Sequence, residues 1–504
     1  MRSKRAHCAL FCEDANGIHR LREVLSRVNY TNAGVLTALG VGELSPMRGS
    51  DVPLLVRRTS GGTPLDTLIR LLLIGVPVEI EAARRAVQPM QLEEWVNGGL
   101  LRVTGASVAA TVKLLLYQGL VIAFDPPPGS GSPVSSDHVM GVGSSSLTLA
   151  NVTIRRPSRL TLDLGTGCGI QAFLAAPHSD RVLAVDRNPR AVGLTEFNAQ
   201  LNGFANIDCM GGDLFEPANA HEFDLVISNP PFVISPEARY IYRDSGLHGD
   251  QICQRIVREV PRHLSDGGYC QILCNWAHIG GQDWKERLAS WFQGTGCDAW
   301  VMRSETRDAS TYASTWIRET ERDNPERFAQ RLDEWLAYYD RERIEAMSAG
   351  VITMRRSSRR TNWFRADDGP EKMVGPCGED IARGFELRDF LETVRDDQVL
   401  MEARLCASPD VRLEQQSEPS GDGWRVTASA IRLVRGLAYS GTIDTVGANM
   451  IAQCDGKRRV RELLTGAAAS LDADLESITP GCLAIVRRLM GQGFLIPVEL
   501  SRGA

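Results

Sequence analysis

The stretch Leu162-Asp163-Leu164-Gly165-Thr166-Gly167-Cys168-Gly169-Ile170 decides the fold class of this chain. It places the apolar run Leu160–Leu164 directly before three glycines that are separated by single residues. Glycine adopts backbone angles that other residues rarely adopt, and it lets a ligand approach the main chain where a Cβ atom would clash. The stretch therefore predicts a strand that ends in a tight ligand-binding turn, with contacts from Gly165, Thr166, Gly167 and Gly169.

Three further apolar runs follow the first, with room for a helix between them: Val182–Val185, Asp224–Ile227 and Tyr269–Leu273. Strands that are apolar throughout and alternate with helices indicate a parallel sheet covered on both faces. The sequence therefore predicts an α/β fold with a mostly parallel sheet. Residues 283–346 have the pattern of long charged helices, and Gly350–Arg356 is expected to return to the sheet as its last strand.

The glycine turn differs from the nicotinamide-binding fingerprint G-x-G-x-x-G, because Ile170 stands where the last glycine would be. Asp163, two residues before the first glycine, is also foreign to that fingerprint. A carboxylate at this position is placed to face a cationic amine rather than a pyrophosphate. The turn therefore disfavours a nicotinamide-dependent oxidoreductase.

Acidic residues follow two later strands. Asp186 ends the second strand, where a carboxylate accepts hydrogen bonds from ribose hydroxyls. As an alternative, Asp186 caps the helix that begins at Pro189. Asp213 is placed to accept a hydrogen bond from an adenine amino group, while Leu214 or Phe215 packs on the ring.

Behind the run Asp224–Ile227 the chain reads Ser228-Asn229-Pro230-Pro231-Phe232-Val233. Two consecutive prolines exclude a helix and a central strand. Taken alone, the prolines have a simple alternative explanation, namely that they end the strand. Their position after three other polar strand ends favours a functional loop.

Five segments together resemble the Rossmann-like S-adenosylmethionine-dependent methyltransferases of class I. They are L-D-L-G-T-G-C-G, A-V-D-R-N-P-R-A, N-A-Q-L-N-G, G-D-L-F-E-P and S-N-P-P-F. Within this group they resemble the small-domain branch with the motif Asn-Pro-Pro-(Tyr/Phe). That branch includes release-factor glutamine methyltransferases (HemK/PrmC-like) and N-methyltransferases of RNA or DNA bases. The resemblance is good over residues 137–280 and loose over 281–370, and it does not cover the flanking parts.

The resemblance implies S-adenosylmethionine as cofactor, held by Asp163, Gly165, Thr166, Gly167, Gly169, Asp186, Asp213, Leu214 and Asn229. It also implies Asn229 as the central substrate residue. The Asn229 side-chain oxygen and the Pro230 carbonyl would each accept one N–H of a planar nitrogen and hold its lone pair toward the methyl carbon. Pro230 and Pro231 would fix this backbone, and Phe232 would stack on the planar group.

The leading hypothesis for the acceptor is a glutamine side chain of a protein such as a translation factor. The alternative is a nucleic-acid base, at adenine N6 or guanine N2, and a third is an inactive adaptor. Phe232 replaces the tyrosine usual in release-factor enzymes, which favours RNA-base relatives, whereas the glycine and G-D-L-F-E-P segments favour release-factor relatives. Net charge favours protein, because the chain carries −6 and residues 1–150 only +2.

The chain is expected to contain three parts. We expect a helical, winged-helix-like module over residues 1–125 and a linker over 126–136. The Rossmann-like domain is expected over 137–370, with a helical insertion at about 283–346, and a small α+β module over 371–504. The flanking modules would dock the substrate. With no C-x-x-C pair, no signal peptide and no apolar run of membrane length, we expect a cytosolic protein without a metal site.

Three weaker candidates remain. Arg243–Asp250 is expected to shape the substrate entrance or to be a plain capping loop. Ser144–Ser146 either contacts the cofactor or forms a turn. Arg355–Arg360 would grip phosphate or be a solvated charge run. The aromatic residues between 284 and 339 are expected in the core rather than in a nucleobase platform.

Overall fold

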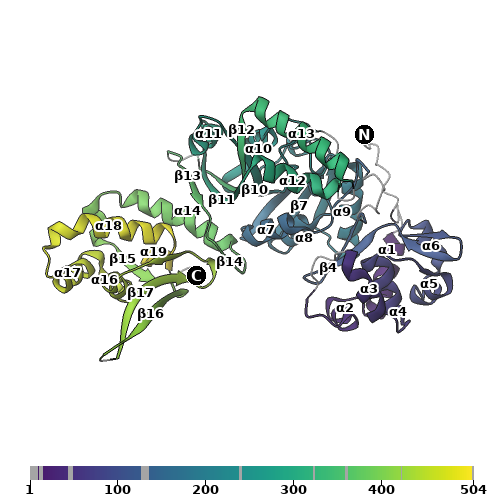
Figure 1. Ribbon diagram of the computed structural model, residues 1–504, viewed down its shortest axis with the longest axis horizontal. Coiled ribbons are helices and arrows are strands. Elements are labelled where there is room, and N and C mark those ends of the chain that lie inside the picture. Colours follow the sequence, from purple (N-terminus) through teal and green to yellow (C-terminus); the bar gives the residue numbers. More distant parts are fainter. Residues whose placement is uncertain are drawn as a thin grey trace. The chain divides into compact units, whose positions relative to one another are not determined.

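The computed structural model describes residues 10, 15–43, 49–126, 135–237, 241–321, 324–357, 361–421 and 423–501. The chain forms two compact units, of which the first comprises residues 1–150 and 157–367 and the second 151–156 and 368–504 (Figure 1). Most of the expected linker 126–136 and the end of the run Arg355–Arg360 lie outside the described residues. Within the described ranges, no helix is long and apolar enough to cross a bilayer, and no group of side chains could hold a metal ion.

An eight-stranded sheet forms the centre of the first unit, with the order β13-β11-β12-β10-β9-β6-β7-β8. Five neighbouring strands are parallel, which confirms the predicted α/β fold with a mostly parallel sheet. These strands are β6 (Ser158–Leu164), β7 (Ser179–Asp186), β8 (Ile207–Gly211), β9 (Phe223–Ser228) and β10 (Leu264–Ile279).

The other end of the sheet is antiparallel, and here the sequence prediction was partly wrong. Residues 297–308, expected to be helical, form strand β11 (Cys297–Asp308), which pairs with β12 (Ile344–Arg356). Only the first half of β11 is buried, and its charged second half hides the alternation of a strand. Strand β12 is not the last strand, since β13 (Phe364–Asp368) follows beside β11.

Helices cover the sheet. They are α7 (Ser144–Val152), α8 (Ile170–Ala175), α9 (Pro189–Asn202), α10 (Gln251–Glu259) and α11 (Trp284–Phe292). Between β11 and β12 the chain inserts two more, α12 (Ala309–Thr320) and α13 (Pro325–Glu342). The insertion is thus shorter than the predicted 283–346.

The N-terminal part of the first unit is helical and ends in a hairpin. Its helices are α1 (Ala15–Arg27), α2 (Asn32–Leu39), α3 (Val52–Arg58), α4 (Pro64–Leu68), α5 (Ile80–Ala86) and α6 (Leu92–Asn97). Thr63 and Asp66 form a capping box on α4, at the helix start expected from Thr63-Pro64. A small sheet of β1 (Val78–Glu79), β3 (Ser107–Ala110) and β2 (Leu101–Thr104) and the hairpin β4 (Lys113–Tyr117) with β5 (Leu120–Phe124) complete it.

Two asparagines of the segment N-A-Q-L-N-G join this N-terminal part to helix α9. The side-chain amide of Asn198 accepts from Ala123 N and donates to Ala123 O, at 2.8 and 2.9 Å. Asn202 makes the same pair of bonds with Val121, each 2.8 Å long. The amides thus extend the free edge of β5 as a strand would, which satisfies buried backbone groups.

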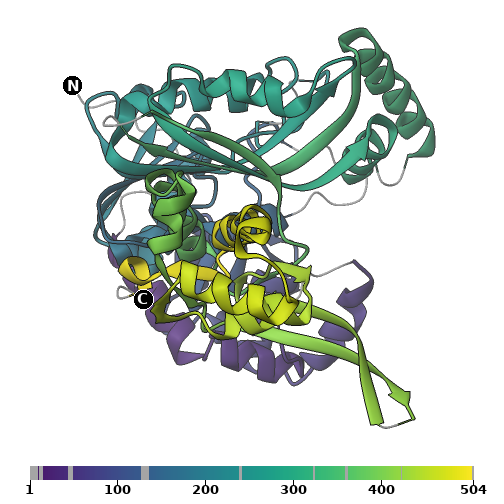
Figure 2. The same cartoon turned by 90° about the vertical axis from the view of Figure 1, so that its left-hand side faces the viewer.

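The second unit is built from helices and short strands. Helices α14 (Gly378–Thr393), α15 (Asp397–Glu402), α17 (Val460–Leu471) and α18 (Leu475–Gly491) accompany a sheet of β20 (Asp455–Arg459), β15 (Arg404–Ala407) and β21 (Leu495–Pro497). The hairpin β16 (Val411–Ser420) and β17 (Gly423–Leu433) projects from the body of this unit (Figure 2).

Candidate active site

The candidate site lies where the strand order reverses, between β6 and β9. Ligands of open α/β sheets bind at this switch point, beyond the carboxyl ends of the strands. A cavity of about 290 Å³ opens here, and segments that follow β6, β7, β8 and β9 line it. Of the residues predicted for the site, it brings together Gly165, Thr166, Gly167, Asp186, Asp213, Leu214, Asn229, Pro230, Pro231 and Phe232. Asp163 and Gly169 are not among the lining residues.

The glycine turn after β6 depends on left-handed backbone at Gly165 and Gly167, with φ of 77° and 58°. A Cβ atom at either position would meet nothing within 4 Å, so both residues present bare main chain toward the cavity. Gly169 has a different role, because its added Cβ would lie 2.4 Å from the ring of Phe173. The third glycine therefore allows helix α8 to start against the core.

Asp163 supports the turn from beneath. Its Oδ2 accepts hydrogen bonds from Thr166 Oγ1 at 2.6 Å and from Ala172 N at 3.0 Å, and the side chain is 1% exposed. The sequence predicted that Asp163 would contact a cationic amine directly. Its buried position instead favours a role in holding the turn. Burial raises the pKa of Asp163 to about 7, against the two hydrogen bonds that lower it.

This pKa predicts a dependence of stability on pH. The unfolded carboxyl titrates near 3.8, so between about pH 4 and 7 the folded chain keeps a proton that the unfolded chain has lost. The stability from this group is therefore present below pH 4 and lost as the pH rises through 7. Asp163→Asn keeps an oxygen acceptor but no charge, and we expect it to be more stable than the natural chain by about 2 to 4 kcal/mol at pH 8. Urea unfolding at pH 4, 6 and 8 measures this; a difference independent of pH would contradict it.

Asp186 at the end of β7 lines the cavity and is held by two backbone N–H groups. Its Oδ2 accepts from Gly167 N at 2.9 Å and its Oδ1 from Asn188 N at 2.8 Å. Burial raises the pKa of this carboxyl, and the two backbone hydrogen bonds oppose the shift. Asn188, not Asp186, caps α9, by accepting from Arg190 N at 3.0 Å. The helix-cap alternative for Asp186 is therefore wrong.

Asp213 and Leu214 follow β8 at the same edge. Asp213 Oδ2 accepts from Arg255 Nη1 at 2.9 Å, and the side chain of Asp213 is half exposed. Leu214 lies in the left-handed region, with φ of 46°. Phe215 is buried and stacks on His263 at 4.7 Å between ring centroids, so Leu214 is the apolar residue available to a ligand.

The Asn-Pro-Pro-Phe segment is tied to the neighbouring strand and to α7. Ser228 Oγ donates to Leu164 O at 2.7 Å, which joins the ends of β9 and β6. Asn229 Nδ2 donates to Ser145 Oγ at 3.2 Å. The Asn229 Oδ1 atom is buried and has no hydrogen-bond partner among the described residues. An acceptor in this state is expected to be satisfied by a ligand or an ordered water molecule.

Several lining residues were weak candidates in the sequence or were missed. Ser144, Ser145 and Ser146 line the cavity, and Gln171 Nε2 donates to Ser146 O at 2.8 Å. Trp316 of α12 also lines it, and its ring stands edge-on to Phe232 at 6.4 Å between centroids. Of the aromatic residues expected in the core, Trp335 and Tyr339 are indeed buried, whereas Trp316 is not. No sequence pattern distinguishes Trp316, because only the insertion of α12 after β11 carries it to the cavity.

Comparisons with known proteins agree with this geometry. Residues 134–294 match the family described as methyltransferase small domain, and residues 27–111 and 382–497 match two domains of unknown function, DUF7059 and DUF7782. The release factor glutamine methyltransferase of Geobacter sulfurreducens is 35% identical over 22% of this chain and 43% of its own length. The ribosomal protein uL3 glutamine methyltransferase of Bradyrhizobium diazoefficiens is 37% identical, over 22% and 40%.

The release factor glutamine methyltransferase of Escherichia coli is 32% identical over 24% of this chain and 48% of its own length. The match therefore spans less than half the length of each of these three relatives. Among solved structures, Trm5b from Pyrococcus abyssi matches 51% of this chain and 62% of its own chain at 16% identity, with a TM-score of 0.31.

The sheet, the switch-point cavity and the glycine turn define a Rossmann-like domain, and the family match identifies it as a methyltransferase domain of class I. More particularly, residues 134–294 match the methyltransferase small domain. The resemblance predicted from the Asn-Pro-Pro-Phe and glycine segments is confirmed.

Proposed function

We propose that this chain transfers a methyl group from S-adenosylmethionine to the side-chain amide nitrogen of a glutamine in a protein. The single observation that carries the proposal is the buried, unpartnered Oδ1 of Asn229 beside the glycine turn. A buried oxygen without a hydrogen bond costs about 1 to 3 kcal/mol of free energy. An N–H of the group that receives the methyl would recover this energy by donating to Asn229 Oδ1. The Pro230 carbonyl is proposed as the second acceptor.

The residues of the cavity fit S-adenosylmethionine. Gly165 and Gly167 leave room against the main chain for its methionyl end. Asp186 would accept from its ribose hydroxyls, because each carboxylate oxygen keeps a lone pair beyond its bond to a backbone N–H. Asp213 and Leu214 would hold the adenine, and Asp163 would act by supporting the turn. When bound, the cofactor supplies a methyl group on a sulfonium centre.

Asn229 and Pro230 would act by orientation. The nitrogen of a carboxamide is a poor nucleophile because its lone pair is delocalised into the carbonyl. Two acceptors that each take one N–H would hold the NH₂ group with its lone pair toward the methyl carbon, and they would stabilise positive charge that develops on nitrogen. Phe232 would pack on the flat face of the group. The proton could leave after transfer, so no separate base is required.

Two observations support glutamine over a nucleic-acid base. The curated relatives quoted above are named as glutamine methyltransferases. Of the two arginines that line the cavity, Arg243 is ion-paired with Asp244 and only Arg187 is exposed, which offers little grip for phosphate. The proposed localisation is the cytosol, where such acceptors occur.

The acceptor is tested by supplying labelled S-adenosylmethionine with four probes in separate reactions. The probes are a peptide release factor, ribosomal protein uL3, transfer RNA and ribosomal RNA. We expect label in a protein, at a glutamine identified by mass spectrometry. Label in RNA alone would replace the glutamine proposal by methylation of adenine N6 or guanine N2.

Ser145 is expected to hold the amide of Asn229 in the productive orientation. Ser145→Ala removes the oxygen that accepts from Asn229 Nδ2, so the amide can turn its oxygen away from the cavity. We expect kcat to fall about tenfold, the value of one hydrogen bond, while the affinity for S-adenosylhomocysteine stays within about twofold. Ser145→Thr retains a hydroxyl and should recover most of the rate. An unchanged kcat in Ser145→Ala would show that the contact is dispensable.

A further inference from the structure

The chain that follows Asn-Pro-Pro-Phe contacts the inserted helices, and Asp250 at its end also accepts from Ala277 N of β10 at 2.9 Å. We use the term acceptor segments for residues 232–237 and 241–250. Tyr312 of α12 accepts a hydrogen bond from Ile234 N at 3.1 Å, and Tyr339 of α13 donates to Ile234 O at 2.8 Å. Tyr338 of α13 accepts from Gly249 N at 3.0 Å. Arg243 Nη1 also donates to Trp316 O of α12 at 3.4 Å, so both segments contact α12 and α13.

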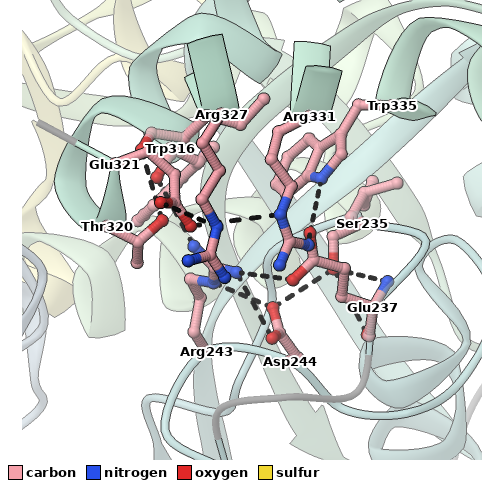
Figure 3. Close-up of polar contacts among 12 residues, drawn as sticks. Ser235, Glu237, Arg243, Asp244, Trp316, Thr320, Glu321, Arg327, Arg331 and Trp335 are labelled. Carbon is pink, nitrogen blue, oxygen red and sulfur yellow. Dashed lines mark hydrogen bonds and ion pairs between the residues drawn. The ribbon is translucent and has the colours of Figure 1, made fainter. Parts of the chain in front are cut away.

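Glu237 lies at the centre of a charged contact between the first segment and α13 (Figure 3). Its Oε1 forms an ion pair with Arg331 and accepts from Trp335 Nε1 at 3.0 Å. Its Oε2 is 3.7 Å from Arg243 Nη2 of the second segment. The Glu237 side chain is 14% exposed and that of Arg243 is 3% exposed, so neither charge is well solvated. Loss of the Glu237 charge would leave Arg243 with Asp244 and Arg331 with Glu321, at 3.9 Å, and would remove the carboxylate that joins the two arginines.

Further contacts connect Arg243 to Phe232, the residue that follows the two prolines. Arg243 Nε donates to Asp244 Oδ1 at 2.9 Å, and Ser235 Oγ donates to the same oxygen at 3.1 Å (Figure 3). Asp244 forms an antiparallel bridge with Phe232. Because Phe232 also meets Trp316 of α12, the ring is held between the second acceptor segment and the insertion.

We propose that α12 and α13 are the acceptor-recognition element of this site, with Trp316 as a specificity-determining residue and Glu237 as the positioning residue that fixes the acceptor segments. The inference rests on the proposed methyl transfer and adds which part of the chain reads the acceptor. Trp316 and Phe232 form a wall of two rings whose planes meet at 69°, so the planar group has one ring face to pack on and one ring that limits its width. A change at Trp316 alters which acceptors fit. A change at Glu237 alters how well the wall is held.

The cofactor side of the cavity is built independently of this element. Asp163 holds the glycine turn, Asn188 N donates to Asp186, and Arg255 pairs with Asp213. None of the hydrogen bonds and ion pairs described above joins Asp163, Asn188 or Arg255 to α12 or α13. Cofactor affinity is therefore the control for an effect confined to the acceptor.

The first experiment compares Glu237→Gln with Glu334→Gln. Glu334 is an exposed residue of α13 that accepts from Gln330 Nε2 at 2.9 Å and has no ion pair among the described residues. In Glu237→Gln we expect amide hydrogen exchange to be at least about tenfold faster in peptides from 241–250. We also expect kcat/KM for the methylated probe to be about 10- to 100-fold lower, mainly through KM, with the affinity for S-adenosylhomocysteine unchanged within twofold. Glu334→Gln should match the natural chain in all three measurements.

Unchanged exchange in Glu237→Gln overturns the positioning role, whatever the activity. Tyr339→Phe, which removes only the bond to Ile234 O, repeats the exchange test if Glu237→Gln does not fold. Trp316→Ala should change the relative kcat/KM among the release factor, uL3 and RNA probes at least about tenfold, and Trp316→Phe should restore the order. An equal loss with every probe overturns the specificity role. If the natural chain binds S-adenosylhomocysteine but labels none of the probes, the proposed acceptor fails, while the exchange result still decides the positioning role.

Discussion

Asn229→Ala is expected to lower the rate of methyl transfer at least about 100-fold and to leave cofactor affinity within about threefold. Removal of one preorganised polar group that binds the reacting centre costs about 10²- to 10³-fold in kcat in enzymes of known mechanism. Asn229 Oδ1 is such a group, because it is buried beside the glycine turn without a partner among the described residues. The alanine variant also leaves Ser145 Oγ without its donor from Asn229, a cost expected to affect stability only slightly.

The measurement combines single-turnover transfer from labelled S-adenosylmethionine with calorimetric binding of S-adenosylhomocysteine. Asn219→Ala is the matched control, since Asn219 is exposed and does not line the cavity. If Asn229→Ala transferred methyl groups at the natural rate, the orientation mechanism would be wrong. If neither form transferred while both bound the cofactor, the chain would be an adaptor that retains the ligand site.

Gly169→Ala is expected to destabilise the first unit by about 2 to 5 kcal/mol. The backbone at this position has φ of 89°, and the left-handed region costs an alanine about 1 to 2 kcal/mol. The new Cβ would also lie 2.4 Å from Phe173 Cζ and 2.9 Å from Thr195 Cγ2. Phe173 is 1% exposed and stacks on Phe204 at 5.4 Å, so the ring has little room to move, and overpacking adds about 1 to 3 kcal/mol.

Gly211→Ala at the end of β8 is the control for this prediction. Its Cβ would meet nothing within 4 Å, and its φ is not positive. Urea unfolding followed by circular dichroism measures the free energy of unfolding. This free energy should be well below that of the natural chain in Gly169→Ala and within about 1 kcal/mol of it in Gly211→Ala. Equal midpoints for the two variants would show that Phe173 and the turn relax around the new methyl group.

Local patterns predicted the elements that hold the methyltransferase site. A glycine turn, two consecutive prolines and apolar runs are decided over a few residues, because backbone angles and strand burial depend on near neighbours in the chain. The predicted strands, the α/β class and most predicted site residues therefore lie where expected around one cavity. The position of Asp163 was less predictable. Its spacing placed it near the turn, but only burial by α8 decided that the carboxylate supports the turn from beneath.

The amino-acid sequence by itself thus determined the class of the central domain, the glycine turn and the loop at Asn229. Tertiary structure alone decided that residues 297–308 are a strand, that Trp316 reaches the cavity, and that Glu237 meets Arg331. Each of these depends on partners far away in the sequence, such as β12 for β11 or α13 for Glu237. The charged half of β11 stays exposed in the sheet, so its residues have the local pattern of a solvated segment. Glu237 likewise has the local pattern of a solvated glutamate, until the fold removes most of the water around its side chain.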